Sequence, residues 1–345
     1  MPEHSTTPPE PTHSALAEDY SRLDPNTIID AVESLGFLSD ARVLALNSYE
    51  NRVYQVGIED SVPLIAKFYR PCRWSDKQIL EEHQFSTTLA ELEIPVVPPL
   101  YLPDSQPDSS LFYYSGYRFS LYRRQGGRAP ELTNLDHLYR LGKFMGRIHA
   151  VGKSGLFQHR PTLSINSFIL RPYQYILDNN FLPDLYVPSY KAIVADILKH
   201  VESKYEQCAP QLIRLHGDCH PGNILWTDNG PHFVDFDDSR NGPAIQDLWM
   251  LLSGEPHEQE IQLREILEGY EEFCDFNPAE LNLIEALRSM RIIHYAGWLA
   301  RRWSDPAFPK AFPWFNTETF WGEHILQLKE QLAALQNPPL QVYPQ

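Results

Sequence analysis

Cysteine is scarce in this sequence, and the few cysteines are far apart. The chain of 345 residues contains four, Cys72, Cys208, Cys219 and Cys274, and no two of them form a C-x-x-C pair. Small secreted proteins that depend on disulfides carry many closely spaced cysteines instead. The sequence therefore gives no sign of a disulfide framework and predicts reduced thiols, as in a cytosol.

Positive charge is also in short supply. The 29 Lys and Arg residues against 45 Asp and Glu leave a formal net charge of -16 at pH 7. Because the nucleic-acid backbone attracts basic protein surfaces, this balance argues against a nucleic-acid partner. Any bound nucleotide must meet a local positive group or a metal ion.

Long apolar segments are missing as well. No stretch has the run of about 20 uncharged apolar residues that a membrane-spanning helix needs. The N-terminal segment has neither the basic start nor the apolar centre of a signal peptide. These absences predict a soluble, cytoplasmic protein without a membrane anchor.

Length and composition predict two lobes. Residues 1–22 are rich in Pro, Ser and Thr, which predicts a mobile tail. Strand-like runs and one helical pattern occupy residues 23–122, and helical periodicity dominates residues 123–345, with Gly126 and Gly127 near the boundary. The expected fold class is α+β, with an antiparallel-sheet N-lobe and a mainly helical C-lobe.

Two charged residues of the N-lobe range fall on apolar faces. Strand alternation in "VPLIAKFY" places Lys67 on one face with Ile65 and Tyr69. In the helical pattern that starts near Ser75, Glu82 rather than Glu81 lies on the side of the apolar positions. Lysine stems also lie commonly along apolar surfaces, and helix glutamates are ordinary, so neither residue is decisive alone.

The most informative segment is "LHGDCHPGNILWTDNGPHFVDFDD". An Asn-Gly pair between the apolar runs "NILW" and "HFVDF" predicts a β-hairpin. Folding about that turn brings Asn223 close to Asp235, and Pro221 in the preceding loop allows the chain to return Asp218 to the same place. Carboxylate and amide oxygens are ligands that suit Mg²⁺.

The spacing of these residues matches the protein-kinase signature H-R-D-L-x-x-x-N followed by a strand and D-F. Phosphoryl transfer needs metal ions at the phosphates, a carboxylate that accepts the proton of the attacking hydroxyl, and a lysine on the nucleotide. The prediction is Asp218 and Asp235 as catalytic residues, Asn223 and Asp235 as Mg²⁺ ligands, and Lys67, held by Glu82, on the ATP phosphates.

The same segment could instead be a zinc cluster of His216, Cys219 and His220, although loop-structuring roles for the two histidines are the stronger hypothesis. Further along, Asp247 either binds the backbone of the catalytic loop or is an ordinary first-turn carboxylate of a helix. The many aromatic residues near the C-terminus, among them Trp314, are attributed to core packing.

The elements "HGDCHPGN", "VDFDD" and "GPAIQDLWMLL" resemble the aminoglycoside-phosphotransferase and choline-kinase group of kinase-like enzymes, with His220 in place of the protein-kinase loop lysine. Longer stretches, such as "LNSYENRVYQ" and "RRWSDPAFPKAFPWF", are similar to bacterial serine/threonine protein kinases of this fold. The resemblance implies a monomeric, cytoplasmic, ATP- and Mg²⁺-dependent kinase. It implies that the enzyme phosphorylates Ser and Thr of proteins, itself included, and limits damage under oxidative or envelope stress.

The resemblance also assigns Ser48, in "LNSYENR", to the loop over the ATP phosphates. That loop lacks the G-x-G-x-x-G of ordinary protein kinases, so side-chain contacts from Ser48 or Asn47 are expected there. Two alternatives remain open at this point. One is a kinase for a small alcohol such as an amino sugar, choline or homoserine, and the other is a nucleotide-binding pseudokinase.

Overall fold

The structure of the protein is a computed structural model that describes residues 19–103 and 109–343. Residues 1–18, the larger part of the predicted tail 1–22, lie outside the described residues. Within the described part of the chain, no helix combines the length and the hydropathy required to cross a membrane.

The chain divides into two compact units. Of the described residues, the first unit contains those up to Thr87 and those from Val97 to Gln125, and the second contains Thr88–Val96 and those from Gly126 onward. An antiparallel sheet forms the centre of the first unit, whereas helices dominate the second. The predicted α+β fold class, with a sheet in the N-terminal part and helices in the C-terminal part, is therefore confirmed.

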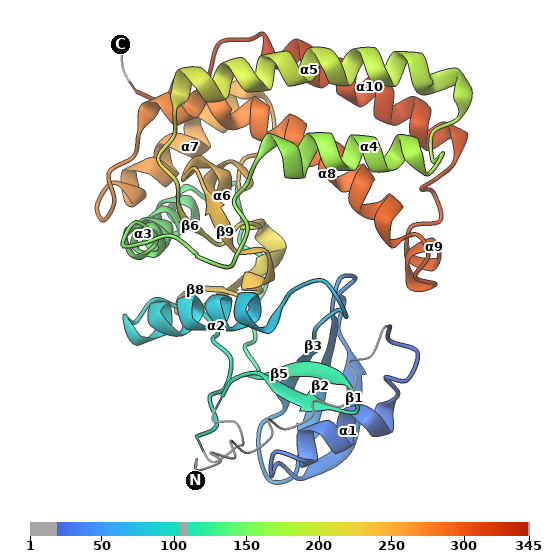
Figure 1. Ribbon diagram of the computed structural model, residues 1–345. Coiled ribbons are helices and arrows are strands. Elements are labelled where there is room, and N and C mark those ends of the chain that lie inside the picture. Colours follow the sequence, from blue (N-terminus) through green and yellow to red (C-terminus); the bar gives the residue numbers. More distant parts are fainter. Residues whose placement is uncertain (1–18, 104–108, 344–345) are drawn as a thin grey trace, which may run out of the picture. The chain divides into compact units, whose positions relative to one another are not determined.

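Five strands form the sheet of the first unit, in the order β1-β2-β3-β5-β4 with every neighbouring pair antiparallel (Figure 1). The strands are β1 (Ser39–Ala45), β2 (Arg52–Ile58), β3 (Leu64–Phe68), β4 (Phe112–Tyr114) and β5 (Tyr117–Arg123). Strand β3 is internal, and its neighbours are β2 and β5. This position places the residues of β3 at the centre of the sheet.

Helix α1 (Pro25–Glu33) packs on the same core as the sheet. Its first turn is stabilised by the carboxylate of Asp24, which accepts a hydrogen bond from the backbone N–H of Thr27 at 2.8 Å. Tyr20 adds a further contact, because its hydroxyl donates to the carbonyl oxygen of Phe68 at 3.0 Å. The last residues of the predicted tail range thus contribute to the packing of the sheet.

Helix α2 (Asp76–Glu91) follows β3 and has the predicted phase. Glu82 is buried, at 3% exposure, together with Ile79, Ser86 and Leu89, whereas Glu81 is half-buried. The helical period therefore identified correctly which of the two adjacent glutamates faces inward.

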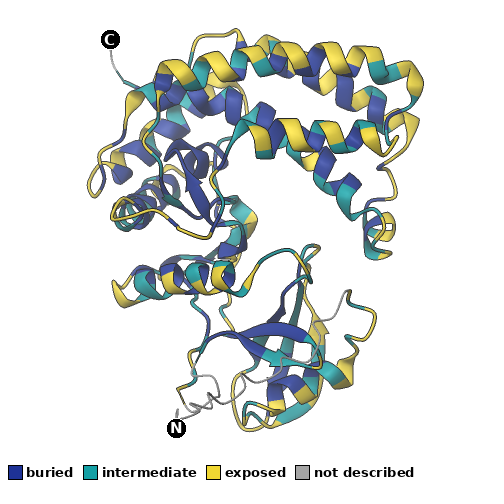
Figure 2. Ribbon diagram, viewed as in Figure 1, coloured by how far each residue is buried: buried dark blue, intermediate teal, exposed yellow. Residues whose placement is uncertain are grey.

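Among the described residues of the second unit, helix α3 packs against α7, α4 packs against α8, and α10 packs against both α5 and α8 (Figure 1). Figure 2 shows α5 and α10 with exposed residues on one side and buried residues on the other. The helices are α3 (Leu135–Gly152), α4 (Arg171–Asp178), α5 (Val187–Cys208), α6 (Ile245–Trp249), α7 (Pro256–Tyr270), α8 (Ile284–Arg302), α9 (Ala307–Ala311) and α10 (Glu318–Leu335).

Two short antiparallel ribbons lie between these helices in the chain. Strand β6 (Ile213–Leu215) pairs with β9 (Arg240–Gly242), and β7 (Ile224–Thr227) pairs with β8 (Gly230–Phe233). The loop between β6 and β7 and the segment after β8 contain the predicted catalytic and metal-binding residues.

Glycines allow α3 and α7 to approach closely. A side chain at Gly142 would collide with the backbone carbonyl of Ile266, and one at Gly146 would collide with that of Tyr270. Because backbone cannot move aside as a flexible side chain can, this contact holds α3 at a defined distance from α7. The contact matters for the site, since α3 carries the buried His149.

A buried glutamate supports the start of α6. Glu280 is 3% exposed, and its Oε2 accepts a hydrogen bond from the backbone N–H of Ile245 at 3.0 Å. Burial raises the pKa of Glu280 to about 7, although the N–H of Ile245 and the charge of Lys153 act in the opposite direction. The carboxyl therefore keeps its proton in the folded protein over a pH range in which the unfolded chain loses it.

This pKa predicts a pH-dependent stability that Glu280→Gln should remove. Between pH about 4.5 and about 7 the folded state binds more protons, so the free energy of unfolding falls as the pH rises, by up to about 3 kcal/mol. Urea unfolding at several pH values should show this fall in the unsubstituted protein and in the exposed control Glu202→Gln. Equal slopes in Glu280→Gln and the control would contradict the prediction.

Candidate active site

Lys67 lies in the centre of the first unit's sheet. On β3 it is opposite Val53 of β2 and Ser120 of β5, and it is only 6% exposed. Its Nζ lies 5.5 Å from the ring centroid of Tyr69. A buried ammonium group needs polar or anionic neighbours, because loss of water destabilises the charge.

A buried polar network surrounds Tyr69 on that face. Its hydroxyl lies 2.7 Å from Nε2 of His83 and 3.1 Å from the hydroxyl of Tyr122, and Nδ1 of His83 lies 2.8 Å from Oγ of Ser110. Burial raises the pKa of Tyr69 far above its usual range. The carboxylate of Glu82 raises the pKa further and the ammonium of Lys67 lowers it.

Because the charges of Lys67 and Glu82 both act on the pKa of Tyr69, the two side chains lie near the same phenol. The structure thus brings the two predicted residues of the first unit into one buried region. Their assignment to the nucleotide phosphates stays a prediction.

Ser48 lies in the loop between β1 and β2, where it makes a local contact. Its hydroxyl donates to the carbonyl oxygen of Asn51 at 3.2 Å. Asn51 is buried, and its Oδ1 accepts from the backbone N–H of Arg70 at 3.1 Å. Side chains therefore hold the turn that would be held by backbone geometry in a glycine-rich loop, and a nucleotide contact of Ser48 stays a prediction.

In the second unit, the loop after β6 carries Asp218. Its Oδ1 accepts a hydrogen bond from Nη1 of Arg291 at 2.7 Å, and its Oδ2 lies 3.5 Å from Nε2 of His220. The amide Nδ2 of Asn223 donates to the backbone carbonyl of Asp218 at 3.0 Å. The side-chain nitrogen of Asn223 thus stabilises the loop. The side-chain oxygen of Asn223 is the atom that could bind a metal ion.

The predicted β-hairpin is confirmed, and it brings Asn223 next to the segment of Asp235. Ile224 is opposite Phe233, and the backbone N–H of Val234 donates to the carbonyl oxygen of Asn223 at 3.0 Å. The two turn residues are Asp228 and Asn229 rather than the predicted Asn-Gly pair, because Gly230 already pairs with Thr227 as the first residue of β8.

Asp235 leaves the hairpin in a left-handed conformation, with a φ of 62°. A residue other than glycine takes up this conformation at a cost in free energy, and such residues concentrate at functional sites. At Asp235 the chain turns away from the direction of β8. This is the position at which a metal ligand is predicted.

Asp247, at the start of α6, binds the backbone of the loop that carries Asp218. Its two carboxylate oxygens accept hydrogen bonds at 2.8 Å from the N–H groups of His216 and Gly217, and Oδ2 lies 3.1 Å from Nε2 of His149. Asp247 is fully buried. Burial favours its protonated form, but the hydrogen bond and the charge of His149 hold the pKa below its usual range.

The first of the two hypotheses for Asp247 is therefore correct: the carboxylate orders the loop that carries Asp218. His149, which sequence analysis missed, is the third group bound to it. Its position on the buried side of α3 was the available signal, since a polar residue in an apolar helical stripe requires a partner.

The contacts of His216 and Cys219 favour structural roles. Nε2 of His216 lies 2.9 Å from the carbonyl oxygen of Val234, and its ring centroid lies 4.5 Å from that of Phe236. Burial raises the pKa of Cys219 well above its usual range, and its sulfur lies 3.7 Å from that of Met145. Among the described residues, no group of three His, Cys, Asp or Glu side chains is arranged to hold a metal ion, as a zinc cluster would require.

A family model described as the phosphotransferase enzyme family matches residues 42–284. The chain belongs to this family. The predicted enzyme class, a kinase that takes ATP as its co-substrate, follows from this membership. The long motifs named above also carry a narrower resemblance, to stress response kinase A, and that resemblance is confirmed by curated relatives of this phosphotransferase.

Stress response kinase A of Escherichia coli strain K12 is 44% identical over 325 residues, which cover 94% of this chain and 97% of that protein. The serine/threonine protein kinase RdoA of Salmonella typhimurium is 44% identical with the same coverage. Among solved structures, an amicoumacin kinase in complex with AMP-PNP matches this phosphotransferase with a TM-score of 0.69 at 18% identity, covering 91% of this chain and 94% of that one. A microcompartment-associated aminopropanol kinase matches with a TM-score of 0.68 at 14% identity, covering 93% and 100%.

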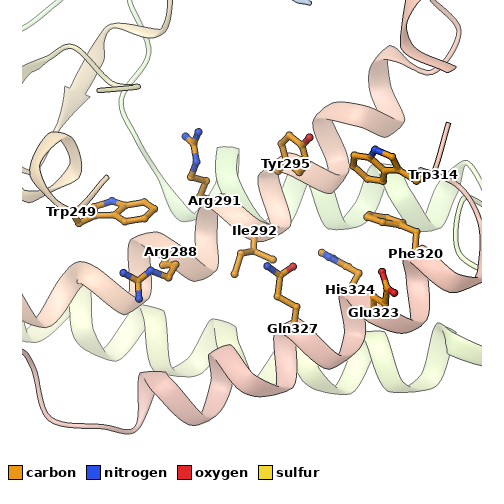
Figure 3. A pocket seen from close by; sticks show the side chains of 10 residues that line it. All are labelled: Trp249, Arg288, Arg291, Ile292, Tyr295, Trp314, Phe320, Glu323, His324 and Gln327. Carbon is orange, nitrogen blue, oxygen red and sulfur yellow. The ribbon is translucent and has the colours of Figure 1, made fainter. Parts of the chain in front are cut away.

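The second unit of this phosphotransferase also contains a pocket of about 680 Å³ (Figure 3). It is lined by residues of α6, α8, α10 and the segment before α10: Trp249, Arg288, Arg291, Ile292, Tyr295, Trp314, Phe320, Glu323, His324 and Gln327. Trp314, attributed to core packing from the sequence, is 45% exposed and lines this pocket. Arg291 lines the pocket and also contacts Asp218. No local sequence pattern predicted the pocket or this contact.

Proposed function

We propose that the protein is an ATP- and Mg²⁺-dependent serine/threonine protein kinase that acts, as a monomer in the bacterial cytoplasm, in the response to oxidative or envelope stress. The observation that carries the catalytic part is the arrangement of the β6–β7 loop and the β7–β8 hairpin, which gathers Asp218, Asn223 and the segment of Asp235. The acceptor and the biological role rest on relatives named stress response kinase A and serine/threonine protein kinase RdoA.

Asp218 is the proposed catalytic base. Its carboxylate would orient the hydroxyl of a Ser or Thr acceptor and accept the proton as the oxygen attacks the γ-phosphate. The backbone just before it is held by Asp247, which His149 contacts in turn, so the carboxylate of Asp218 has a defined position before the substrates bind. Such preorganisation is the main contribution a protein makes to phosphoryl transfer.

Asn223 and Asp235 fit Mg²⁺ by their chemistry. One amide oxygen and one carboxylate are hard donors, and Mg²⁺ in kinases is commonly held by one or two such side chains together with phosphate oxygens and water. The hydrogen bond from Nδ2 of Asn223 to the loop fixes which end of the amide remains for a ligand. When bound, the ion offsets negative charge on the phosphate oxygens.

Lys67, Glu82 and Ser48 are proposed to act on the nucleotide. Lys67 would contact the ATP phosphates, Glu82 would hold the ammonium group, and the loop of Ser48 would cover the phosphates. Burial of both Lys67 and Glu82 supports this assignment, because two charges taken out of water require each other or a ligand.

The second candidate is a kinase for a small alcohol. The pocket of about 680 Å³ favours it, since concave sites for small molecules commonly have 300–1,000 Å³. In that case the pocket would enclose the whole acceptor rather than one segment of a protein.

Labelled ATP distinguishes these functions. Purified protein with Mg²⁺, alone and with a generic protein acceptor, should produce phosphoserine or phosphothreonine, and chelation of the metal should stop the reaction. Rapid saturable turnover of one alcohol from a metabolite panel, with negligible protein labelling, would replace the first proposal with the second. Nucleotide binding without turnover on any acceptor would identify a pseudokinase.

A further inference from the structure

The proposed catalytic base is paired with an arginine that also lines the pocket. Nη1 of Arg291 lies 2.7 Å from Oδ1 of Asp218, and the side chains are 41% and 24% exposed. Burial and the positive charge of Arg291 lower the pKa of the neighbouring His220, although Asp218 raises it. Arg291 is the cationic partner of this carboxylate.

This ion pair is exchangeable. Both side chains reach water, and ion pairs of this kind contribute little to stability because water and other ions compete for them. While the pair is formed, one of the two oxygens of Asp218 is occupied. An anionic group that entered the pocket and bound Arg291 would release that oxygen for the acceptor hydroxyl.

A second arginine on the same face of α8 gives the pocket a cationic end. Arg288 lies one turn before Arg291, donates to Glu285 at 2.7 Å and to Gln259 at 3.2 Å, and lies 5.5 Å above the ring of Trp249. These contacts hold Arg288 in place. Arg291, by contrast, can exchange its contact with the carboxylate of Asp218 for a contact with another anionic group.

The opposite side of the pocket has a different character. Figure 3 shows Trp314 close to Phe320, with Glu323 on the same side and away from Arg288. The ring centroids of Trp314 and Phe320 are 5.5 Å apart, and Trp314 is partly exposed. This side offers an apolar surface, and the carboxylate of Glu323 would repel an acidic group from it.

We propose that Arg291 determines acceptor specificity by selecting an acidic side chain, Asp or Glu, close to the phosphorylated Ser or Thr. This inference rests on the proposed protein-kinase function. The acidic group takes over the guanidinium of Arg291 at the cationic end of the pocket, and an apolar side chain of the same segment packs against Trp314 and Phe320. Arg291 thereby acts as a positioning residue for Asp218, which it holds until an acceptor of the right charge arrives.

The test is a set of Ser- and Thr-centred peptides in which each flanking position carries Asp, Ala or Lys. The unsubstituted enzyme should phosphorylate peptides with Asp at one position with a KM about tenfold lower than those with Lys, as expected for one charge-assisted hydrogen bond. Arg291→Gln should lose this preference mainly through KM, Arg291→Lys should keep most of it, and Arg291→Glu should favour Lys peptides. The control Arg264→Gln, at an exposed position that is not part of the pocket lining, should behave as the unsubstituted enzyme.

The outcomes separate the inference from the proposed function. Equal KM values for Asp, Ala and Lys peptides with the unsubstituted enzyme would overturn the role of Arg291 alone, because peptide phosphorylation itself would be present. Absence of any peptide or protein labelling would overturn the protein-kinase function and this inference with it. If Arg291→Gln did not fold, the unsubstituted enzyme would decide: KM for Asp peptides should rise with salt and KM for Ala peptides should not.

Discussion

Asp218→Asn should reduce the rate of phosphoryl transfer about 10³-fold, the typical effect of removing a general base. Asparagine has nearly the same shape, and its side-chain oxygen can still accept the hydrogen bond that Arg291 donates to Oδ1 of Asp218. The amide cannot take the proton of the attacking hydroxyl. The fold and the affinity for ATP should therefore persist while turnover is lost.

Initial rates with labelled ATP, together with thermal unfolding, measure this prediction. The matched control is Asp228→Asn, an exposed carboxylate in the turn of the β7–β8 hairpin, which should retain full activity. A kcat of Asp218→Asn within a few fold of the unsubstituted enzyme would remove Asp218 from the chemistry. It would also remove the main support for the assigned roles of Asn223 and Asp235.

Asp247→Ala should have the largest effect on stability. The carboxylate is fully buried and accepts hydrogen bonds from the backbone of His216 and Gly217 and from the ring of His149. Removal of one partner from such a buried charged network costs about 3–5 kcal/mol, since the remaining donors stay out of water without an acceptor. The loop that carries Asp218 should relax, and activity should fall even in the folded fraction.

Urea unfolding of Asp247→Ala at neutral pH gives the free energy directly. Asp178→Ala, at an exposed position at the end of α4, is the control and should change stability by less than about 0.5 kcal/mol. Because the pKa of Asp247 is depressed in the folded state, its stabilisation is present above the ordinary carboxyl range and is lost as the pH falls. The difference between the unsubstituted protein and Asp247→Ala should accordingly shrink in acid, and a difference independent of pH would contradict this account.

Much of the fold and part of the site follow from local patterns. Alternation in β3 predicted the face of Lys67, and the period of α2 predicted that Glu82 rather than Glu81 is buried. The Asn-Gly turn predicted the hairpin that brings Asn223 beside the segment of Asp235. Each of these features depends on residues that are close in the chain, where backbone geometry alone sets the direction of a side chain.

The contacts that order the loop of Asp218 could not be derived in this way. Asp247 and His216 are 31 residues apart, His149 and Asp247 are 98 apart, and Arg291 and Asp218 are 73 apart. The sequence allows two hypotheses for Asp247 but contains no sign of the contact between Arg291 and Asp218. The partner of a side chain over such separations depends on the angle and spacing at which whole helices pack, and close glycine contacts such as those between α3 and α7 set that spacing.

The order and spacing of the residues alone predicted a phosphoryl-transfer site: an acid, an amide and a second acid around a hairpin, with a lysine on an upstream strand. The packing of the helices decided which contacts restrain these residues. It buries Asp247 beneath the loop of Asp218, and it directs Arg291 both to Asp218 and into a pocket. Local geometry repeats wherever the same short pattern occurs, whereas a pocket formed by three separate helices exists only once their shared core has closed.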